Sequence, residues 1–207
     1  MSGWLSRRRD TLRAFWDGGF GDELFRAAWC APLLILIGYA AASLRPTLGE
    51  QIYGYFAGLV ASTGAAETTG GALMMTLFEN NLAASVSAMT DGLFPFLYLS
   101  ALPLGFNLFV VGVFAAYYQQ CGFGLGTYLV GILPHGVFEL TALVFSCAAG
   151  LALCRAVTQR LRGREGASIL RTIWGMVHIL WIAVIPLLLL AAAVEAYITP
   201  LLLNAVL

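Results

Sequence analysis

The stretch Leu133-Pro134-His135-Gly136-Val137-Phe138-Glu139-Leu140 places an ionisable pair inside a long apolar segment, residues 125–153. Ionisable groups are costly in lipid, so such a pair within a membrane helix needs a partner. The four-residue spacing puts His135 and Glu139 on one helix face. Because the segment exceeds the roughly 20 residues of one crossing, we expect a helix break at Pro134 and Gly136, preceded by a short re-entrant helix over residues 124–133.

The composition assigns the chain to the membrane proteins. Of its 207 residues, 60% are hydrophobic and only 11% are charged, and the mean hydropathy is +0.84, which lies far outside the range of soluble domains. We therefore predict an all-α, polytopic membrane helix bundle. The formal net charge of zero and the lack of a long basic run give no sign of a nucleic-acid partner.

The apolar segments predict about five membrane-spanning helices in a single transmembrane domain, residues 21–207. An amphipathic helix at the membrane surface, residues 1–20, is expected before it and should end at the Gly18-Gly19 pair. Residues 51–71 are rich in Gly, Ala, Ser and Thr and are not counted as a span, and Pro103 should kink the third span. The predicted spans are residues 27–44, 72–90, 93–118, 134–153 and 173–197.

The arginines predict the orientation of the chain in the membrane. Every arginine except Arg45 lies either before the first span or in the segment from Arg155 to Arg171, and positive residues favour the cytoplasmic side. Both regions should therefore be cytoplasmic, which requires an even number of crossings between them. We expect a multi-pass protein of the cytoplasmic membrane with its N-terminus inside and its C-terminus outside.

With this topology, polar side chains from four helices reach the outer half of the membrane. They are His135 and Glu139 together with Glu79, Asn80, Asn81, Asn107 and Glu195. A hydrogen-bond network that fixes helix packing is the first interpretation, a substrate or ion path the second, and a metal or catalytic site the third. Two ligands four residues apart and a distant glutamate are not an HExxH zinc site, so the sequence assigns no catalytic residue, metal or cofactor.

Three further features carry less information. His178, near the cytoplasmic end of the last span, is interpreted as an interfacial or hydrogen-bonded histidine without a ligand role. The four cysteines lack metal-ligand spacing and are interpreted as small hydrophobic residues. Gly122 and Gly126 form a small-xxx-small pair, which fits either a homodimer contact or the packing of the short helix.

Several of these segments resemble the stage II sporulation protein M family. The resemblance rests on Asn80-Asn81, on Asn107, on the Pro134-His135-Gly136-x-x-Glu139-Leu140 motif with Ala149-Gly150-Leu151, and on the segment from Glu195 to Pro200. It implies a five-span membrane protein that, in spore formers, holds a peptidoglycan-degrading complex at the septal membrane. Relatives in organisms without spores often occur beside MoxR-type ATPases and von Willebrand A-domain proteins.

The sequence leads us to expect a non-enzymatic membrane scaffold, or assembly factor, for envelope partners that remodel peptidoglycan. The alternative is the permease subunit of an exporter with an outward-facing polar cavity, because the surface helix and five to six spans are similar to ABC-2-type permeases. An exporter would need a dimer and a cytoplasmic ATPase. A third class, an intramembrane hydrolase, would require a bound metal.

Overall fold

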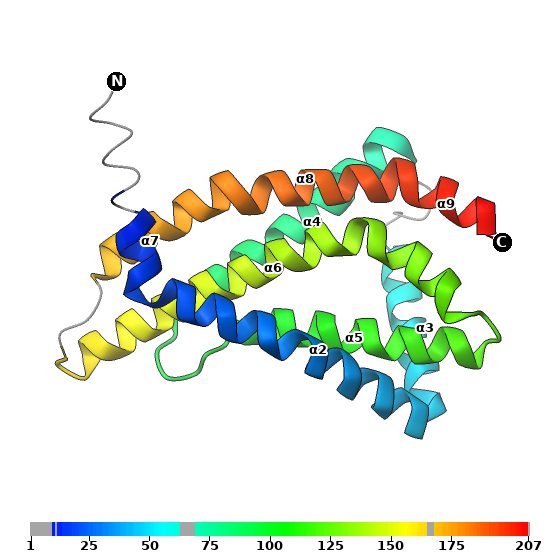
Figure 1. Ribbon diagram of the computed structural model, residues 1–207, viewed down its shortest axis with the longest axis horizontal. Helices are drawn as coiled ribbons and strands as arrows, with labels where there is room; N and C mark the ends of the chain where they lie inside the picture. Colours follow the sequence, from blue (N-terminus) through cyan, green and yellow to red (C-terminus); the bar gives the residue numbers. More distant parts are fainter. Residues whose placement is uncertain (1–9, 11, 63–68, 165–167, 207) are drawn as a thin grey trace. The chain divides into compact units, whose positions relative to one another are not determined.

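The computed structural model describes residues 10, 12–62, 69–164 and 168–206, and within them all regular structure is helical. Helices dominate because a backbone in lipid must satisfy its polar groups internally. Figure 1 follows the chain through these elements. In chain order they are η1 (Trp16–Phe20), α2 (Gly21–Leu44), α3 (Pro46–Ser62), α4 (Gly70–Thr90), η3 (Asp91–Leu93), α5 (Ala101–Gln120), α6 (Leu125–Leu161), α7 (Ile169–Ile179), η4 (Leu180–Val184), α8 (Ile185–Ala193), η5 (Val194–Ile198) and α9 (Thr199–Val206).

Four helical stretches of the described chain are long and apolar enough to cross a membrane: Leu12–Leu44, Ala101–Gln120, Leu125–Leu161 and Ile169–Val206. They coincide with the first, third, fourth and fifth predicted spans. The predicted second span does form a helix, the 21-residue α4, but it is not among the four. Its segment Glu79-Asn80-Asn81 lowers its hydropathy, so a crossing by α4 stays a prediction.

The predicted break at Pro134 is wrong, because α6 runs as one helix of 37 residues with Pro134 inside it. Proline removes one backbone hydrogen bond and bends a helix, but surrounding helices make such a site tolerable within a membrane. Figure 1 shows the α6 ribbon bending along its green part. At about 1.5 Å per residue, α6 is roughly 55 Å long, whereas the hydrocarbon layer is about 30 Å thick. A segment that is too long for one crossing therefore stays a single helix here and is not divided into two.

The third span begins later than predicted, at Ala101 instead of residue 93. Phe96 and Tyr98 have positive φ angles of 67° and 50°, which a helix does not accommodate. The backbone N–H of Phe96 instead donates to Oγ1 of Thr158, at 3.2 Å. Pro103 consequently occupies the first turn of α5, where a proline leaves no helical carbonyl without a partner, and the predicted kink is not required.

Near the N-terminus, the predicted boundary at Gly18-Gly19 coincides with a kink. Gly19 has φ 116° and ψ −7° within η1, a conformation that glycine adopts readily. Residues 1–9 and 11, which are half of the predicted surface helix, lie outside the described residues.

The described helices group into two compact units. The first unit contains the described residues up to Trp29, with Ala83–Leu104 and Thr141–Pro186; the second contains Cys30–Leu82, Gly105–Leu140 and the chain from Leu187 onward. In the first unit, the buried Glu23 forms an ion pair with Arg155, and Phe20, which is 0% exposed, stacks on Phe15 and Phe145.

In the second unit, α2 and α5 pack with their backbones in close approach (Figure 1). A Cβ added at Gly112 would fall on the carbonyl oxygen of Ile35, and one at Gly38 would fall on that of Phe109. Glycines permit such close helix approach in membranes. The same interface buries Ala42, Val113 and Ala116. The first part of α6 packs against α5, where the hydroxyl of Tyr128 donates to the carbonyl oxygen of Val111.

Candidate functional site

His135 and Glu139 both project from α6, one turn apart and half-buried. Because α6 continues through Pro134, the two side chains keep the i, i+4 relationship expected from the sequence. The helix supplies two of the three groups of the site, and the third comes from the C-terminal end of the chain.

Glu195 reaches the site from η5, a π-turn between α8 and α9. The backbone N–H of Thr199 bonds to the carbonyl of Val194, five residues back, which inserts one extra residue into the turn. Pro200 follows directly and lacks an N–H, so regular α-helical bonding cannot continue there. The π-turn sets the direction of Glu195, and it also brings the buried Thr199 to the site.

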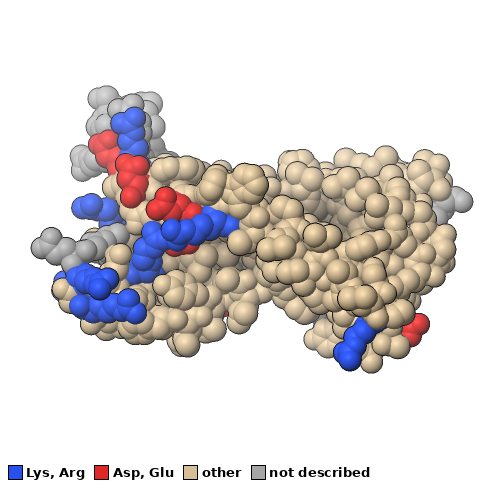
Figure 2. Space-filling view, turned by 60° about the horizontal axis from the view of Figure 1, so that its bottom comes forward, with Lys and Arg blue, Asp and Glu red and all other residues tan. Residues whose placement is uncertain are grey.

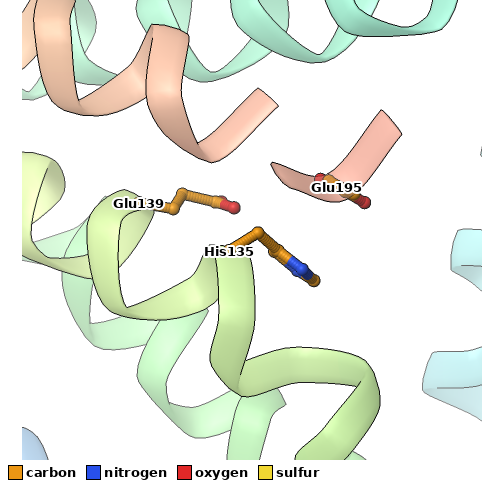
Figure 3. A group of neighbouring side chains, drawn as sticks. All are labelled: His135, Glu139 and Glu195. Atoms are coloured by element: carbon orange, nitrogen blue, oxygen red, sulfur yellow. The ribbon is translucent and has the colours of Figure 1, made fainter. Parts of the chain in front are cut away.

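His135, Glu139 and Glu195 converge in space. One ligand atom from each, an imidazole nitrogen or a carboxylate oxygen, lies within 4.8 Å of the others. Figure 3 shows His135 and Glu139 on one helix with Glu195 on a separate segment facing them. We call these three residues the His–Glu–Glu cluster.

Two neighbours complete the polar contacts of the cluster. The Asn81 side chain, from α4, is hydrogen-bonded to the carboxyl group of Glu139. Nδ1 of His135 lies 3.3 Å from Oγ1 of Thr199, and the Thr199 hydroxyl donates to the carbonyl oxygen of Val194, also at 3.3 Å. With the hydroxyl proton directed at Val194, the hydroxyl oxygen can accept from His135, and this arrangement corresponds to the tautomer with the proton on Nδ1.

The sequence identified most of this site but not all of it. Four predicted residues meet: His135, Glu139, Glu195 and Asn81. Asn107 is half-buried on α5 in the same unit, whereas Glu79 and Asn80 are exposed on α4. Thr199 was missed, although a hydroxyl residue directly before Pro200 and four positions after Glu195 is a signal that it faces the same side.

The cluster lies where the chain offers almost no positive charge. Among all residues of the second unit, Arg45 is the one Lys or Arg, and it is exposed at the end of α2. Two half-buried carboxyl groups therefore have no cationic side chain from that unit beside them other than the imidazole of His135. A buried negative charge needs a proton, a cation or a donor to offset the loss of water.

The structure also bears on the predictions for His178 and for the glycine pair Gly122 and Gly126. His178 is hydrogen-bonded, as predicted: its Nδ1 donates to the carbonyl oxygen of Trp174 at 2.6 Å. A Cβ added at Gly122 or Gly126 would meet no atom within 4 Å, so neither glycine serves close packing inside the described chain. The ion pair between Glu23 and Arg155 was not anticipated from the sequence.

Comparisons with known proteins agree with these features. The chain is 31% identical over 126 residues to an uncharacterised protein of Methanocaldococcus jannaschii, a match that covers 60% of this chain and 70% of the relative. No solved structure matches the chain. The profile of the family described as Stage II sporulation protein M matches residues 27–200, a stretch that includes every residue of the His–Glu–Glu cluster. The chain belongs to the stage II sporulation protein M family.

Proposed function

We propose that this protein is a non-enzymatic membrane scaffold that binds the transmembrane helix of a partner protein of the cell envelope. The observation that carries the proposal is an apolar groove of about 510 Å³ between α2, α5 and the first part of α6. We call it the α2–α5–α6 groove. It is lined by Pro32, Ile35, Leu36, Tyr39, Val111, Ala115, Leu125, Tyr128, Leu129, Ile132, Leu133, Gly136, Val137 and Leu140.

The groove presents almost only hydrocarbon. Its two polar side chains are tyrosines, and both hydroxyls are already used: Tyr39 donates to Oε1 of Gln119 at 2.6 Å, and Tyr128 donates to the carbonyl oxygen of Val111 at 2.6 Å. Small residues at Ala115 and Gly136 leave room for a backbone to come close, which is how helices associate in lipid. This chemistry suits an apolar helix better than a polar ligand.

The charge distribution supports an outward-facing position for the groove. Ten of the eleven arginines belong to the first unit and one to the second. Figure 2 shows few charged atoms, while most of the visible face is tan. The groove lies in the second unit, which carries only one arginine, and the positive-inside rule therefore supports a proposed partner that is anchored in the outer half of the membrane.

Family membership supports the type of partner. The role that the family has in spore formers, holding a peptidoglycan-degrading complex, requires a membrane protein to retain enzymes that act outside the membrane. We propose a membrane-anchored peptidoglycan-remodelling enzyme as the partner here. A MoxR-type ATPase with a von Willebrand A-domain protein is the cytoplasmic alternative.

Site-specific photocrosslinking in native membranes tests the scaffold. A photoreactive residue at Leu36 or Leu129, both exposed in the groove, should trap a membrane-anchored envelope protein, whereas the same residue at Leu190, exposed on α8 outside the groove, should not. Leu133→Trp, at an exposed position in the groove, should fill it and abolish the adduct without lowering the amount of folded protein. Adducts with lipid alone at Leu36 and Leu129 would contradict the proposal.

The permease alternative is favoured by one observation, the polar His–Glu–Glu cluster within an otherwise apolar unit. A permease would need an ATPase at its cytoplasmic surface. The loop from residue 94 to 100 is the available site, because Phe94, Leu97 and Tyr98 are exposed there. Crosslinking from Leu97 that recovers an ATPase, with no protein adduct at Leu36, would favour the permease over the scaffold.

A further inference from the structure

We propose that the His–Glu–Glu cluster binds a divalent transition-metal cation, with Zn²⁺ as the best-suited ion. His135, Glu139 and Glu195 supply one imidazole nitrogen and two carboxylate groups, a ligand set that zinc accepts. The proposal rests on the geometry of these residues and is independent of the scaffold function. The sequence alone offered only two neighbouring ligands, and the fold provides the third.

The distances are compatible with coordination. Ligand atoms held at about 2.0–2.2 Å around a tetrahedral zinc ion lie roughly 3.4 Å from one another. In the structure one ring nitrogen of His135 and one carboxylate oxygen from each glutamate lie within 4.8 Å of one another. Glutamate side chains have three rotatable torsions, so modest rotations of Glu139 and Glu195 close the remaining gap without moving α6 or η5.

The histidine is prepared as a ligand by its hydrogen bond. Metal-binding histidines usually donate their second ring N–H to an oxygen, which fixes the tautomer and the ring orientation. Nδ1 of His135 has this partner in Oγ1 of Thr199, at 3.3 Å, and the Thr199 hydroxyl is itself oriented by the carbonyl of Val194. Nε2 therefore carries the free lone pair.

Asn81 orients the carboxyl group of Glu139, as Thr199 orients the imidazole of His135. Its hydrogen bond to the Glu139 carboxyl group orients a carboxylate that can coordinate a metal ion. Asn81 and Thr199 are therefore positioning residues, and the three cluster residues are the ligands. A solvent molecule completes a four-coordinate ion when the protein supplies three ligands.

Charge balance favours a divalent ion over an empty site. Two carboxylates carry two negative charges, so a divalent cation makes the site neutral, which lipid surroundings favour. The second unit has no Lys or Arg apart from the exposed Arg45. The ion would also connect α6 directly to η5 through bonds that neither helix makes alone.

Metal analysis of the full-length protein, purified in detergent through a tag without histidines, tests the proposal. We expect one equivalent of zinc in the wild type, visible d–d absorption bands after exchange with Co²⁺, and a lower thermal midpoint after chelation with EDTA. These measurements on the wild type do not depend on whether any variant folds. Absence of bound metal, of cobalt bands and of an EDTA effect would overturn the proposal.

Variants locate the ion. His135→Gln, Glu139→Gln and Glu195→Gln should each remove the bound zinc, and Thr199→Val should weaken binding by about 10- to 100-fold, as expected for a group that orients a ligand. The matched controls are His178→Gln, which alters the other histidine, and Glu79→Gln, which alters an exposed glutamate of α4; both should retain wild-type zinc. Equal loss in cluster and control variants, or none in either, would show adventitious binding and refute the site.

Discussion

The imidazole of His135 and the hydroxyl of Thr199 lie 3.3 Å apart, although 64 positions separate the two residues in the chain. The contact joins the first part of α6 to the first residue of α9, directly after the π-turn η5. Thr199 is held at the end of this π-turn, because its backbone N–H bonds to the carbonyl of Val194, five residues back. Through this contact, the π-turn η5 helps to orient the imidazole ring of His135.

Thr199→Val should lower the free energy of unfolding by about 0.6–1.7 kcal/mol, the range of hydrogen bonds measured between membrane helices. The substitution keeps the shape of the side chain but removes its contacts with His135 and Val194. Thr199→Ser retains the hydroxyl and should stay close to the wild type. Unfolding titrations in mixed micelles measure both, and equal stability of the two variants would show that the hydroxyl is unimportant.

Gly112→Ala should destabilise the protein by about 1–3 kcal/mol, because its methyl group would overlap the carbonyl oxygen of Ile35 and push α2 from α5. The matched control is Gly105→Ala in the same helix, where an added Cβ meets nothing within 4 Å. Alanine should be neutral or slightly stabilising there, since glycine disfavours helix. Thermal midpoints in detergent compare the two variants, and a similar decrease in both would contradict the close approach of α2 and α5.

Glu23→Gln should be among the most harmful single substitutions in the first unit. Glu23 is 6% exposed and pairs with Arg155 and, at 3.3 Å, with Arg26. Removing one partner of a buried ion pair costs about 3–5 kcal/mol. Asp22→Asn is the matched control, because the Asp22 side chain is 72% exposed and lies 3.8 Å from the same Arg155. The yield of monodisperse protein after heating should fall sharply only for Glu23→Gln.

Reporter fusions should place Arg162 in the cytoplasm and Val206 outside it, because the arginines concentrate in the first unit. Fusions at Gly70 and Asp91, at the two ends of α4, should then report opposite sides. The Gly70 and Asp91 pair tests whether the polar α4 is the fifth crossing. The same sidedness at both ends of α4 would leave four crossings and would contradict the predicted orientation of one terminus.

The class of protein and the approximate position of most helices can be predicted from the sequence. Lipid offers backbone groups no hydrogen-bond partner, so every apolar segment of sufficient length must form a helix that satisfies itself. Segments such as Ala27–Leu44 or Ile173–Tyr197 can therefore be recognised without knowledge of the rest of the fold. The same reasoning identified His135, Glu139 and Glu195, because ionisable residues are rare in such segments.

Which of the polar residues meet depends on the three-dimensional packing of the helices. Glu195 joins His135 and Glu139 because the π-turn before Pro200 sets its direction, and Asn81, not the exposed Asn80, contacts Glu139 because of the way α4 is rotated. Pro134 lies inside α6 without ending it, because packing against other helices compensates for the backbone hydrogen bond that proline removes. Hydropathy reports how far a segment is buried in lipid, whereas helix rotation and close approach, as at Gly112, depend on side chains from other parts of the chain.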